Sequence, residues 1–239
     1  MSRRRNLVFG WTLAVLAIGL FASLGAWQSR RAVEKQAMLD AADRVLVDRR
    51  AVPLAEAADA QRARDYDWTV GTGRFDARGA LLLDNQQREG RVGVRAYRIF
   101  VPEAGVPLLV DLGWLPLAGD RALPRVEQPA GDYELRGLLV PPPSTGIAVG
   151  PALSATDGGW LMTRVDMQAI AAETGLSVAL APRVLRLDPA LPLGYARDLE
   201  LLPNTLPPDK HRGYAVQWFA LALAVLATAL VLTFRKPRR

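Results

Sequence analysis

Two long uncharged segments, one near each end of the sequence, constrain the fold of this chain more than any other feature. Residues Leu7–Trp27 and Tyr214–Phe234 each form a run of 21 residues without a charged side chain. At a rise of about 1.5 Å per residue, a helix of that length spans roughly 31 Å, close to the thickness of the hydrocarbon core of a bilayer. The sequence therefore predicts two transmembrane helices, residues 7–27 and 214–234.

Basic residues beside these segments predict their orientation. Arginines precede the first segment at positions 3–5, and basic residues follow the second at positions 235, 236, 238 and 239. Positive charges beside a transmembrane helix favour the cytoplasmic side, so we expect the tips, residues 1–6 and 235–239, in the cytoplasm. Residues 28–213 then lie outside it. The expected location is a bacterial plasma (inner) membrane with this segment in the periplasm, since six residues before the first span leave no room for a mitochondrial transit peptide.

The first segment has an alternative interpretation as a cleaved signal peptide, because Ser23 and Gly25 are small enough for a cleavage site. Its length and the charged residues that follow closely favour retention as an anchor. Small residues four apart, such as Gly19 with Ser23 and Ala220 with Ala224, favour close packing of the two helices. The alternative is that alanine and glycine are simply frequent there.

Composition excludes several classes of function. The chain has 239 residues, a net charge of +6, no cysteine and one histidine. Without the seven basic residues at the tips, 23 basic residues face 24 acidic ones, which argues against a nucleic-acid-binding surface. The absence of cysteine excludes disulfides, thiolate catalysis and iron–sulfur ligation. No catalytic triad or phosphate-binding loop is recognisable, so we expect a protein that is not an enzyme.

The middle segment predicts a mainly β domain. The first helix is expected to continue to about Val47 and to end before Pro53. A second helix is expected after Asp166, which can cap it, and Gly175 can close it. The run Pro141–Gly146 predicts an irregular linker or lid. We expect strands near Trp68–Phe75, Ala80–Asn85, Gly93–Val101, Pro107–Leu115, Tyr133–Val140, Gly159–Arg164 and Val184–Asp188.

The expected fold class is two transmembrane helices flanking an extracytoplasmic α+β domain. This domain is mainly antiparallel β, as a sheet or a partly open barrel, with one packed helix.

The single histidine, His211, is the strongest candidate for chemistry. A neutral imidazole is a common ligand of haem iron. His211, Tyr214 and Trp218 share one face of a helix that begins by residue 211, so they predict an iron ligand beside an aromatic wall. The alternative is an interfacial residue that meets lipid headgroups. Arg31, with Arg30 and Lys35, likewise predicts contacts with haem propionates or with lipid phosphates.

Several short motifs follow one another along the chain. They are Trp27-Gln28-x-x-Arg31 with Glu34-Lys35, Tyr66 and Val70 with Gly73–Asp76, Leu82–Asn85 with Gly90-Arg91, Val110–Pro116, Gly137–Pro141, Trp160-x-x-x-Arg164, and His211-x-x-Tyr214 through Phe219. In this order and with this topology, they resemble the surfeit-locus protein one family of cytochrome c oxidase assembly factors. Two positions depart from the family pattern: Leu112 stands where a basic residue is usual, and Asp209-Lys210 stands where other polar residues precede the histidine.

The resemblance implies an accessory role, as a chaperone, in assembling a haem–copper cytochrome c oxidase of a respiratory chain. It implies haem a as a transiently bound cofactor, with His211 as its ligand, and insertion of haem a into the catalytic subunit. The expected partners are that subunit, with haem A synthase as a further candidate, and the lipid bilayer, but no nucleic acid. One alternative is a membrane-anchored scaffold that holds assembly intermediates without haem; a membrane-anchored enzyme is another. Residues expected to contact partners are Trp27, Gln28, Gly113 and Trp114.

Overall fold

The structure is a computed structural model that describes residues 3–144, 149–201 and 206–235. Two compact units divide the chain: residues 1–40 with 205–239, and residues 41–204. The outermost residues of both basic tips lie outside the described residues. So do the last two residues of the expected lid, Pro141–Gly146, whose first four residues adopt no regular secondary structure.

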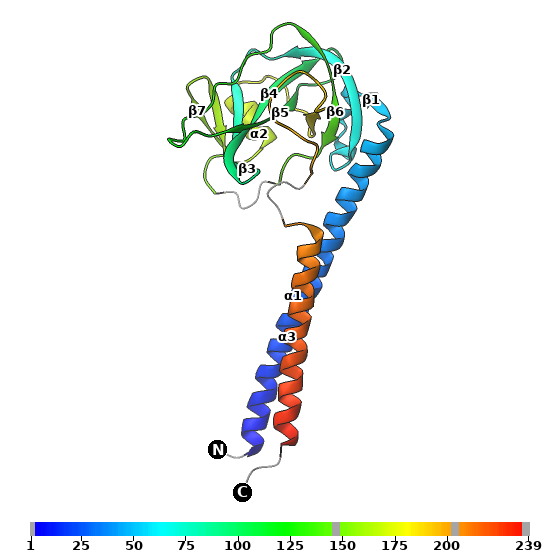
Figure 1. The fold of residues 1–239 in the computed structure, drawn as a ribbon, viewed down its shortest axis with the longest axis vertical. Coiled ribbons are helices and arrows are strands. Elements are labelled where there is room, and N and C mark those ends of the chain that lie inside the picture. Colours follow the sequence, from blue (N-terminus) through cyan, green and yellow to red (C-terminus); the bar gives the residue numbers. More distant parts are fainter. Residues whose placement is uncertain (1–2, 145–148, 202–205, 236–239) are drawn as a thin grey trace. The chain divides into compact units, whose positions relative to one another are not determined.

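The first unit is a pair of long helices, to which α1 (Arg3–Asp48) contributes its N-terminal part and α3 (Pro208–Phe234) its whole length (Figure 1). Both contain a window of mean hydropathy 2.2 and are long enough to cross a bilayer. Trp11 contacts Thr233, and Phe21 stacks on Trp218, so the two helices run antiparallel. Two such helices flanking a folded domain fit a membrane protein, and they confirm the predicted apolar helices.

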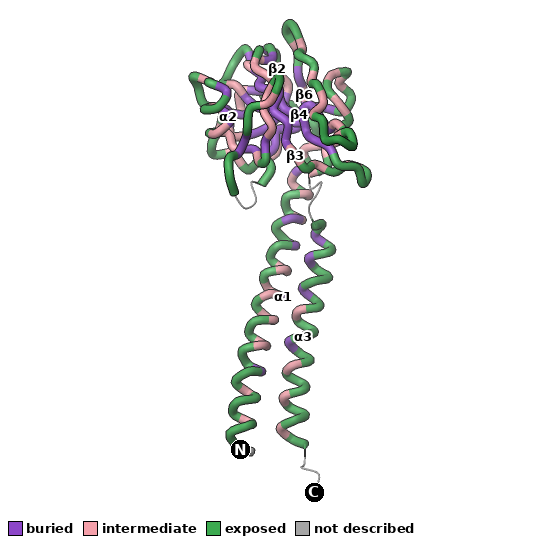
Figure 2. Tube along the Cα trace, turned by 90° about the vertical axis from the view of Figure 1, so that its left-hand side faces the viewer, coloured by how far each residue is buried: buried purple, intermediate pink, exposed green. Residues whose placement is uncertain are grey.

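Small residues lie in the interface of this helix pair, as expected, but the most buried of them are not the predicted ones. Gly25 and Ala32 on α1 and Ala215 and Ala222 on α3 are buried, whereas Gly19 has nothing within 4 Å of the position of a Cβ. Figure 2 shows that the buried stretches of the two helices lie on the sides that face each other. The two buried residues on each helix are seven positions apart, which is about two helical turns, so they lie on the same face of that helix. The predicted pairs of small residues four positions apart did not identify this buried face of each helix.

The second unit is a mixed sheet. Among the described residues, nine strands form it in the order β1-β2-β6-β9-β5-β4-β3-β8-β7, and β2 also pairs with β4. That pairing closes β2, β6, β9, β5 and β4 into a ring, and β1 and the β3-β8-β7 extension lie outside it. The strands are β1 (Ala51–Pro53), β2 (Asp67–Phe75), β3 (Ala80–Arg88), β4 (Arg91–Pro102), β5 (Leu108–Pro116), β6 (Asp132–Val140), β7 (Leu153–Thr156), β8 (Gly159–Met162) and β9 (Val184–Leu187).

The fold class is confirmed: the domain is mainly antiparallel β with one packed helix, and five of its strands close into a barrel-like ring. Parallel pairing occurs between β1 and β2, β3 and β8, and β5 and β9, and the other strand pairs among the described residues are antiparallel. The seven predicted strands are all present, but β1 and β7 were missed because runs of three and four residues are too short to show alternation. Two short 3₁₀ helices, η1 (Leu54–Ala58) and η2 (Ala60–Arg62), follow β1.

The helices of the second unit follow their sequence signals. The helix α2 (Met167–Glu173) is capped by Asp166, whose carboxylate accepts hydrogen bonds from the N–H groups of Gln168 and Ala169. Gly175 adopts a φ of +67° just beyond the helix, as the predicted closing residue should. The helix α1 ends at Asp48, before Pro53 as expected, and Arg49 follows in a left-handed conformation at φ +43°.

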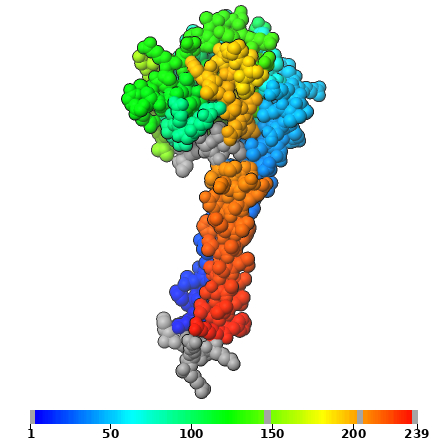
Figure 3. Space-filling view, viewed as in Figure 1, coloured from blue at the N-terminus to red at the C-terminus, as the bar shows by residue number. Residues whose placement is uncertain are grey.

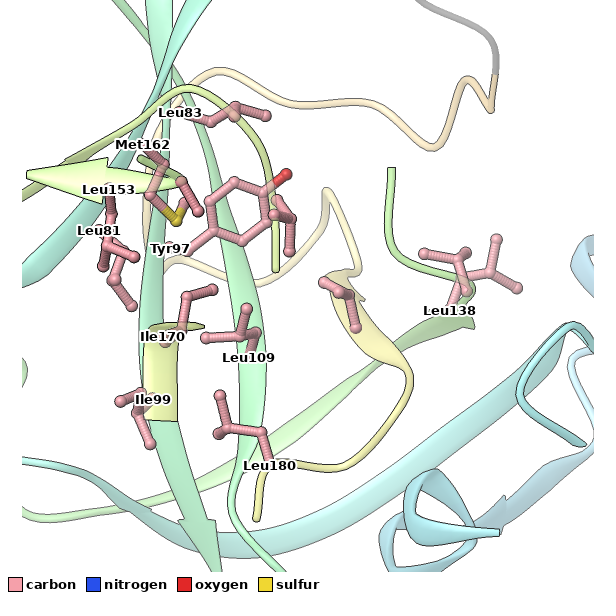
Figure 4. Packing of buried hydrophobic residues seen from close by; sticks show 14 of the residues in the cluster. Leu81, Leu83, Tyr97, Ile99, Leu109, Leu138, Leu153, Met162, Ile170 and Leu180 are labelled. Carbon is pink, nitrogen blue, oxygen red and sulfur yellow. The ribbon is translucent and has the colours of Figure 1, made fainter. Parts of the chain in front are cut away.

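The core lies on both faces of the sheet. One cluster includes Leu81, Tyr97, Leu109 and Ile170, and Figure 4 shows Tyr97 among these side chains. A second cluster includes Val110, the neighbour of Leu109 on β5. Because successive side chains of a strand point to opposite faces, the two clusters lie on opposite sides of the sheet. The continuously apolar run that begins β5 is therefore buried on both faces, as predicted.

Candidate functional site

His211 lies in the first turn of α3, and 6% of its surface is exposed. Its Nδ1 lies 2.6 Å from Oε1 of Gln28 on α1. Because an amide oxygen only accepts hydrogen bonds, Nδ1 carries the proton in this arrangement and Nε2 keeps its lone pair. Nε2 is buried and has no hydrogen-bond partner among the described residues. The structure thus presents an imidazole whose potential ligand atom is uncommitted.

Local sequence signals place this imidazole. Pro208 occupies the first turn of α3, where the missing N–H of a proline is harmless, so the helix begins just before His211. Gly25 lies one turn before Gln28, and a Cβ on it would lie 2.8 Å from the ring of Phe219. The absence of a side chain at Gly25 therefore permits the close approach that brings the Gln28 amide to the imidazole. Figure 3 shows α3 packed along α1 in this unit.

Two positive charges surround the imidazole. Nζ of Lys35 donates a hydrogen bond to the carbonyl oxygen of Leu206 at 2.5 Å, and burial followed by the charge of Arg31 lowers the pKa of Lys35. Burial also lowers the pKa of His211, which precedes the apolar run beginning at Tyr214, and the charges of Lys35 and Arg31 lower it further. The imidazole is therefore neutral near pH 7, the form in which histidine binds metal ions.

The aromatic residues predicted beside His211 lie in different surroundings. Tyr214 is 41% exposed, whereas Trp218 is half-buried and stacks on Phe21, with ring centroids 5.7 Å apart. Arg31 is exposed and pairs with Glu34 at 2.8 Å. The prediction that all three side chains accompany the histidine stays a prediction.

Gln28 was not predicted from the sequence to be the hydrogen-bond partner of His211. Gln28 was expected to contact a protein partner, and so was Trp27, which is 47% exposed. The signal that could have found the pairing is the seven-residue spacing from Phe21 to Gln28 and on to Lys35, which places these residues along one side of α1.

Gly113 and Trp114, the other two residues expected to contact partners, are buried in the second unit. Gly113 has a φ of +114°, and a Cβ on it would lie 2.8 Å from the carbonyl oxygen of Tyr195. Trp114 is 6% exposed, and its Nε1 donates to the carbonyl oxygen of Gln86 at 3.1 Å. Gly113 offers a partner no side chain, and little of the Trp114 side chain lies on the surface. Leu112 is also buried, so the basic residue usual at this position would need a partner of its own.

The donor set of the described residues fits a haem iron better than a bare metal ion. They contain no group of three or more His, Asp or Glu side chains that could hold a metal ion. A haem iron already has four nitrogen ligands from its porphyrin and requires only an axial one. The uncommitted Nε2 of His211 suits that requirement.

These features define a class of protein: a β-barrel domain flanked by two apolar helices, with a buried histidine between the helices. The sequence model of the SURF1 family matches residues 15–223, so the chain belongs to the SURF1 family. This match confirms the resemblance to the surfeit-locus protein one family, which is a family of oxidase assembly factors rather than of catalytic enzymes. No curated protein matches the chain.

Proposed function

We propose that this protein binds haem a through Nε2 of His211 and assists its insertion into the catalytic subunit of a cytochrome c oxidase. Family membership supports the role in oxidase assembly. The observation that carries haem binding is the buried Nε2 of the only histidine, which has no hydrogen-bond partner among the described residues. An unpaired buried polar atom costs stability, so its presence favours a function for it.

Each neighbouring residue has a defined part in this proposal. When bound, haem a would supply an iron that Nε2 of His211 could hold. Gln28 holds the proton on Nδ1, which leaves Nε2 as the ligand atom. Arg31, whose pairing with Glu34 is solvent-exposed and therefore weak, is free to turn toward a propionate. Tyr214 and Trp218 would contact the porphyrin.

The enclosure of Nε2 favours transient binding. Nε2 exposes almost no surface, so side chains around it must shift before a porphyrin reaches it. When a site is open in only a fraction of the molecules, its apparent affinity is that of a preformed site multiplied by this fraction. Weak, reversible binding suits a protein that passes its cargo on.

In the proposed arrangement, both termini lie in the cytoplasm, and residues 28–213 lie in the periplasm of a bacterium, between spans 7–27 and 214–234. Basic residues before the first span and after the second support this orientation. The proposed partners are the catalytic subunit of the oxidase and haem A synthase, which would meet the protein in the plasma membrane.

The test is an optical spectrum of the full chain purified from cells that make haem a, beside His211→Ala. A matched control is Lys210→Ala, which removes an exposed side chain next to the histidine. We expect a haem a band in the wild type and in Lys210→Ala, and none in His211→Ala. A band of equal size in His211→Ala would refute this residue as the ligand.

The alternative is a scaffold that holds assembly intermediates without haem. The enclosure of Nε2 also favours this function, because an atom that stays enclosed binds nothing. In this case no preparation carries haem, and His211→Ala keeps normal oxidase levels while deletion of the protein removes them. Normal haem content of the oxidase in a deletion strain would argue against the haem-handling function.

A further inference from the structure

A polar cavity in the second unit lies far along the chain from His211. Its volume is about 360 Å³, and it is lined by residues of β3, β4 and β5 and by the segment 198–200. Arg88, Arg95 and Trp114 contribute to its wall, together with Asp198 and Glu200. Nothing in the proposed haem chemistry uses this cavity.

A buried cluster of charges lies at this wall. Nη1 of Arg95 donates to Oδ2 of Asp111 at 2.7 Å, and Nε of Arg186 lies 3.6 Å from the same oxygen. Nη2 of Arg186 lies 3.7 Å from Oδ1 of Asp198, which also pairs with Arg88. Three guanidinium groups therefore share two carboxylates, which leaves an excess of one positive charge.

The other described groups near the cluster compensate this charge only weakly. Tyr97 is buried beside the cluster, but burial and the charge of Asp111 raise the pKa of its hydroxyl, so it stays neutral. Glu89 lies 3.8 Å from Nε of Arg88, but its side chain is 83% exposed, and such exposed pairs contribute little. Glu200 lines the cavity with an exposed side chain. Its backbone carbonyl, rather than its carboxylate, accepts a hydrogen bond from Nη1 of Arg186.

Two buried donors in the cluster have no acceptor. Nε of Arg95 and Nε of Arg186 are buried and make no hydrogen bond in the part of the chain that the structure describes. The side chains of these arginines are only 10% and 8% exposed. An unpaired buried donor on a charged group carries a desolvation cost that a suitably placed acceptor removes. The cluster thus lacks one negative charge and at least one acceptor, and a cavity lies beside it.

We propose that this cavity binds a carboxylate group, which completes the cluster by pairing with Arg95. A carboxylate matches the guanidinium geometry and supplies both the missing charge and the missing acceptor. The nearby carboxylates of Asp198 and Glu200 limit the site to a ligand with little negative charge. The group can come from a free small carboxylic acid or from an acidic side chain of a polypeptide.

The experiment is calorimetric titration of the detergent-purified full chain with two kinds of probe. The first probe is acetate, which carries a single carboxylate. The second is a short peptide with blocked ends and one aspartate, compared with the same peptide carrying asparagine. Saturable binding of acetate indicates a free acid, and binding of the aspartate peptide alone indicates a polypeptide side chain. No saturable heat with either probe overturns the proposal and leaves a water-filled cavity.

Two variants link binding to this cavity. Arg95→Lys keeps the charge beside Asp111 but removes Nε as a donor, so we expect about a tenfold or greater loss of affinity. Arg136→Lys is the matched control, because this arginine pairs with Asp188 rather than with the cluster. Glu200→Gln removes an exposed negative charge from the lining and should tighten binding severalfold, even if Arg95→Lys fails to fold. Two results together would overturn the proposal. In the first, Glu200→Gln binds the probe with the same affinity as the wild type. In the second, Arg95→Lys binds it with the same affinity as Arg136→Lys.

Discussion

Oε1 of Gln28 lies 2.6 Å from Nδ1 of His211, although the two residues are 183 positions apart in the chain. This contact joins the ends of the two predicted spans and selects one tautomer of the histidine. The tautomer matters because only the nitrogen without a proton can bind iron. Gln28 is therefore a positioning residue in the proposed function, and Nε2 of His211 is the ligand atom.

Replacing Gln28 with leucine should weaken haem a binding without removing the ligand. Residues that orient a ligating histidine typically contribute about 10- to 100-fold to metal affinity. We expect Gln28→Leu to retain a haem band with lower occupancy and a shifted maximum, measured by the optical spectrum of the purified chain. Gln36→Leu, which alters a glutamine bonded to Asp40 and Arg212 instead, is the control. Identical spectra for Gln28→Leu and wild type would show that this contact does not orient the ligand.

Gly25 should be intolerant of a larger side chain, in contrast to Gly19. A Cβ on Gly25 would lie 2.8 Å from the Phe219 ring, whereas Gly19 has nothing within 4 Å. Overpacking of this kind costs about 1–3 kcal/mol. We expect Gly25→Leu to lower the free energy of unfolding of the helix pair by that amount in mixed micelles of increasing SDS content. Gly19→Leu should leave it nearly unchanged, and equal effects of the two variants would contradict this packing.

Much of the fold could be predicted from the sequence because its signals are local. The apolar helices follow from uninterrupted hydrophobic runs, and the cap of α2 follows from Asp166 and Gly175. The strands β1 and β7 could not be found, because they are short and depend on neighbours that are distant in sequence. The closure of the ring by β2 and β4 is likewise a tertiary pairing that leaves no periodic signal in either strand.

The candidate site was only partly predictable for the same reason. His211 stands out as the only histidine, and its place at the start of a span follows from the sequence. Its contact with Gln28 and the separation of Tyr214 from the buried face depend on how the two helices pack. The ion cluster of Arg95, Asp111 and Arg186 joins three strands, so no spacing along the chain reveals it.

Gly113 should be required for folding of the second unit. Its φ of +114° is strained for any other residue, and a Cβ would meet the carbonyl oxygens of Tyr195 and Ala196 at 2.8 and 2.9 Å. Such backbone strain costs about 1–3 kcal/mol, and the backbone oxygens cannot move aside easily. We expect Gly113→Ala to lower the thermal unfolding midpoint of the full chain. Gly119→Ala, at an open position, should not.

The expected role of Gly113 in partner contacts makes a different prediction. A contact residue, when substituted, would reduce oxidase assembly while the protein kept its stability and amount. If the structural role is correct, oxidase levels should fall only in proportion to the folded protein that remains. Measuring the oxidase level and the amount of folded protein in the same strain separates the structural role from the contact role.

Asp188 should make the second unit sensitive to acid. Its carboxylate accepts hydrogen bonds from Nε of Arg136 at 2.8 Å and from the N–H of Ala190 at 3.0 Å. Burial alone raises the pKa of Asp188, but these hydrogen bonds and the charges of Arg136 and Arg49 lower it overall below the ordinary value of 3.8. The folded protein therefore holds this proton less readily than the unfolded chain does.

Stability from Asp188 is therefore fully present above the ordinary pKa of 3.8 and is lost as the pH falls through the lower pKa of the folded state. We expect Asp188→Asn to be less stable than the wild type at neutral pH and to lose less stability on acidification below about pH 4. The measurement is the thermal midpoint of the full chain between neutral pH and about pH 2. Asp132→Asn, at an exposed carboxylate with no ion pair among the described residues, should follow the wild-type curve. If Asp188 is a source of acid sensitivity, the difference in thermal midpoint between wild type and Asp188→Asn must shrink as the Asp188 carboxyl takes up its proton. Parallel curves for the two proteins would therefore exclude Asp188 as such a source.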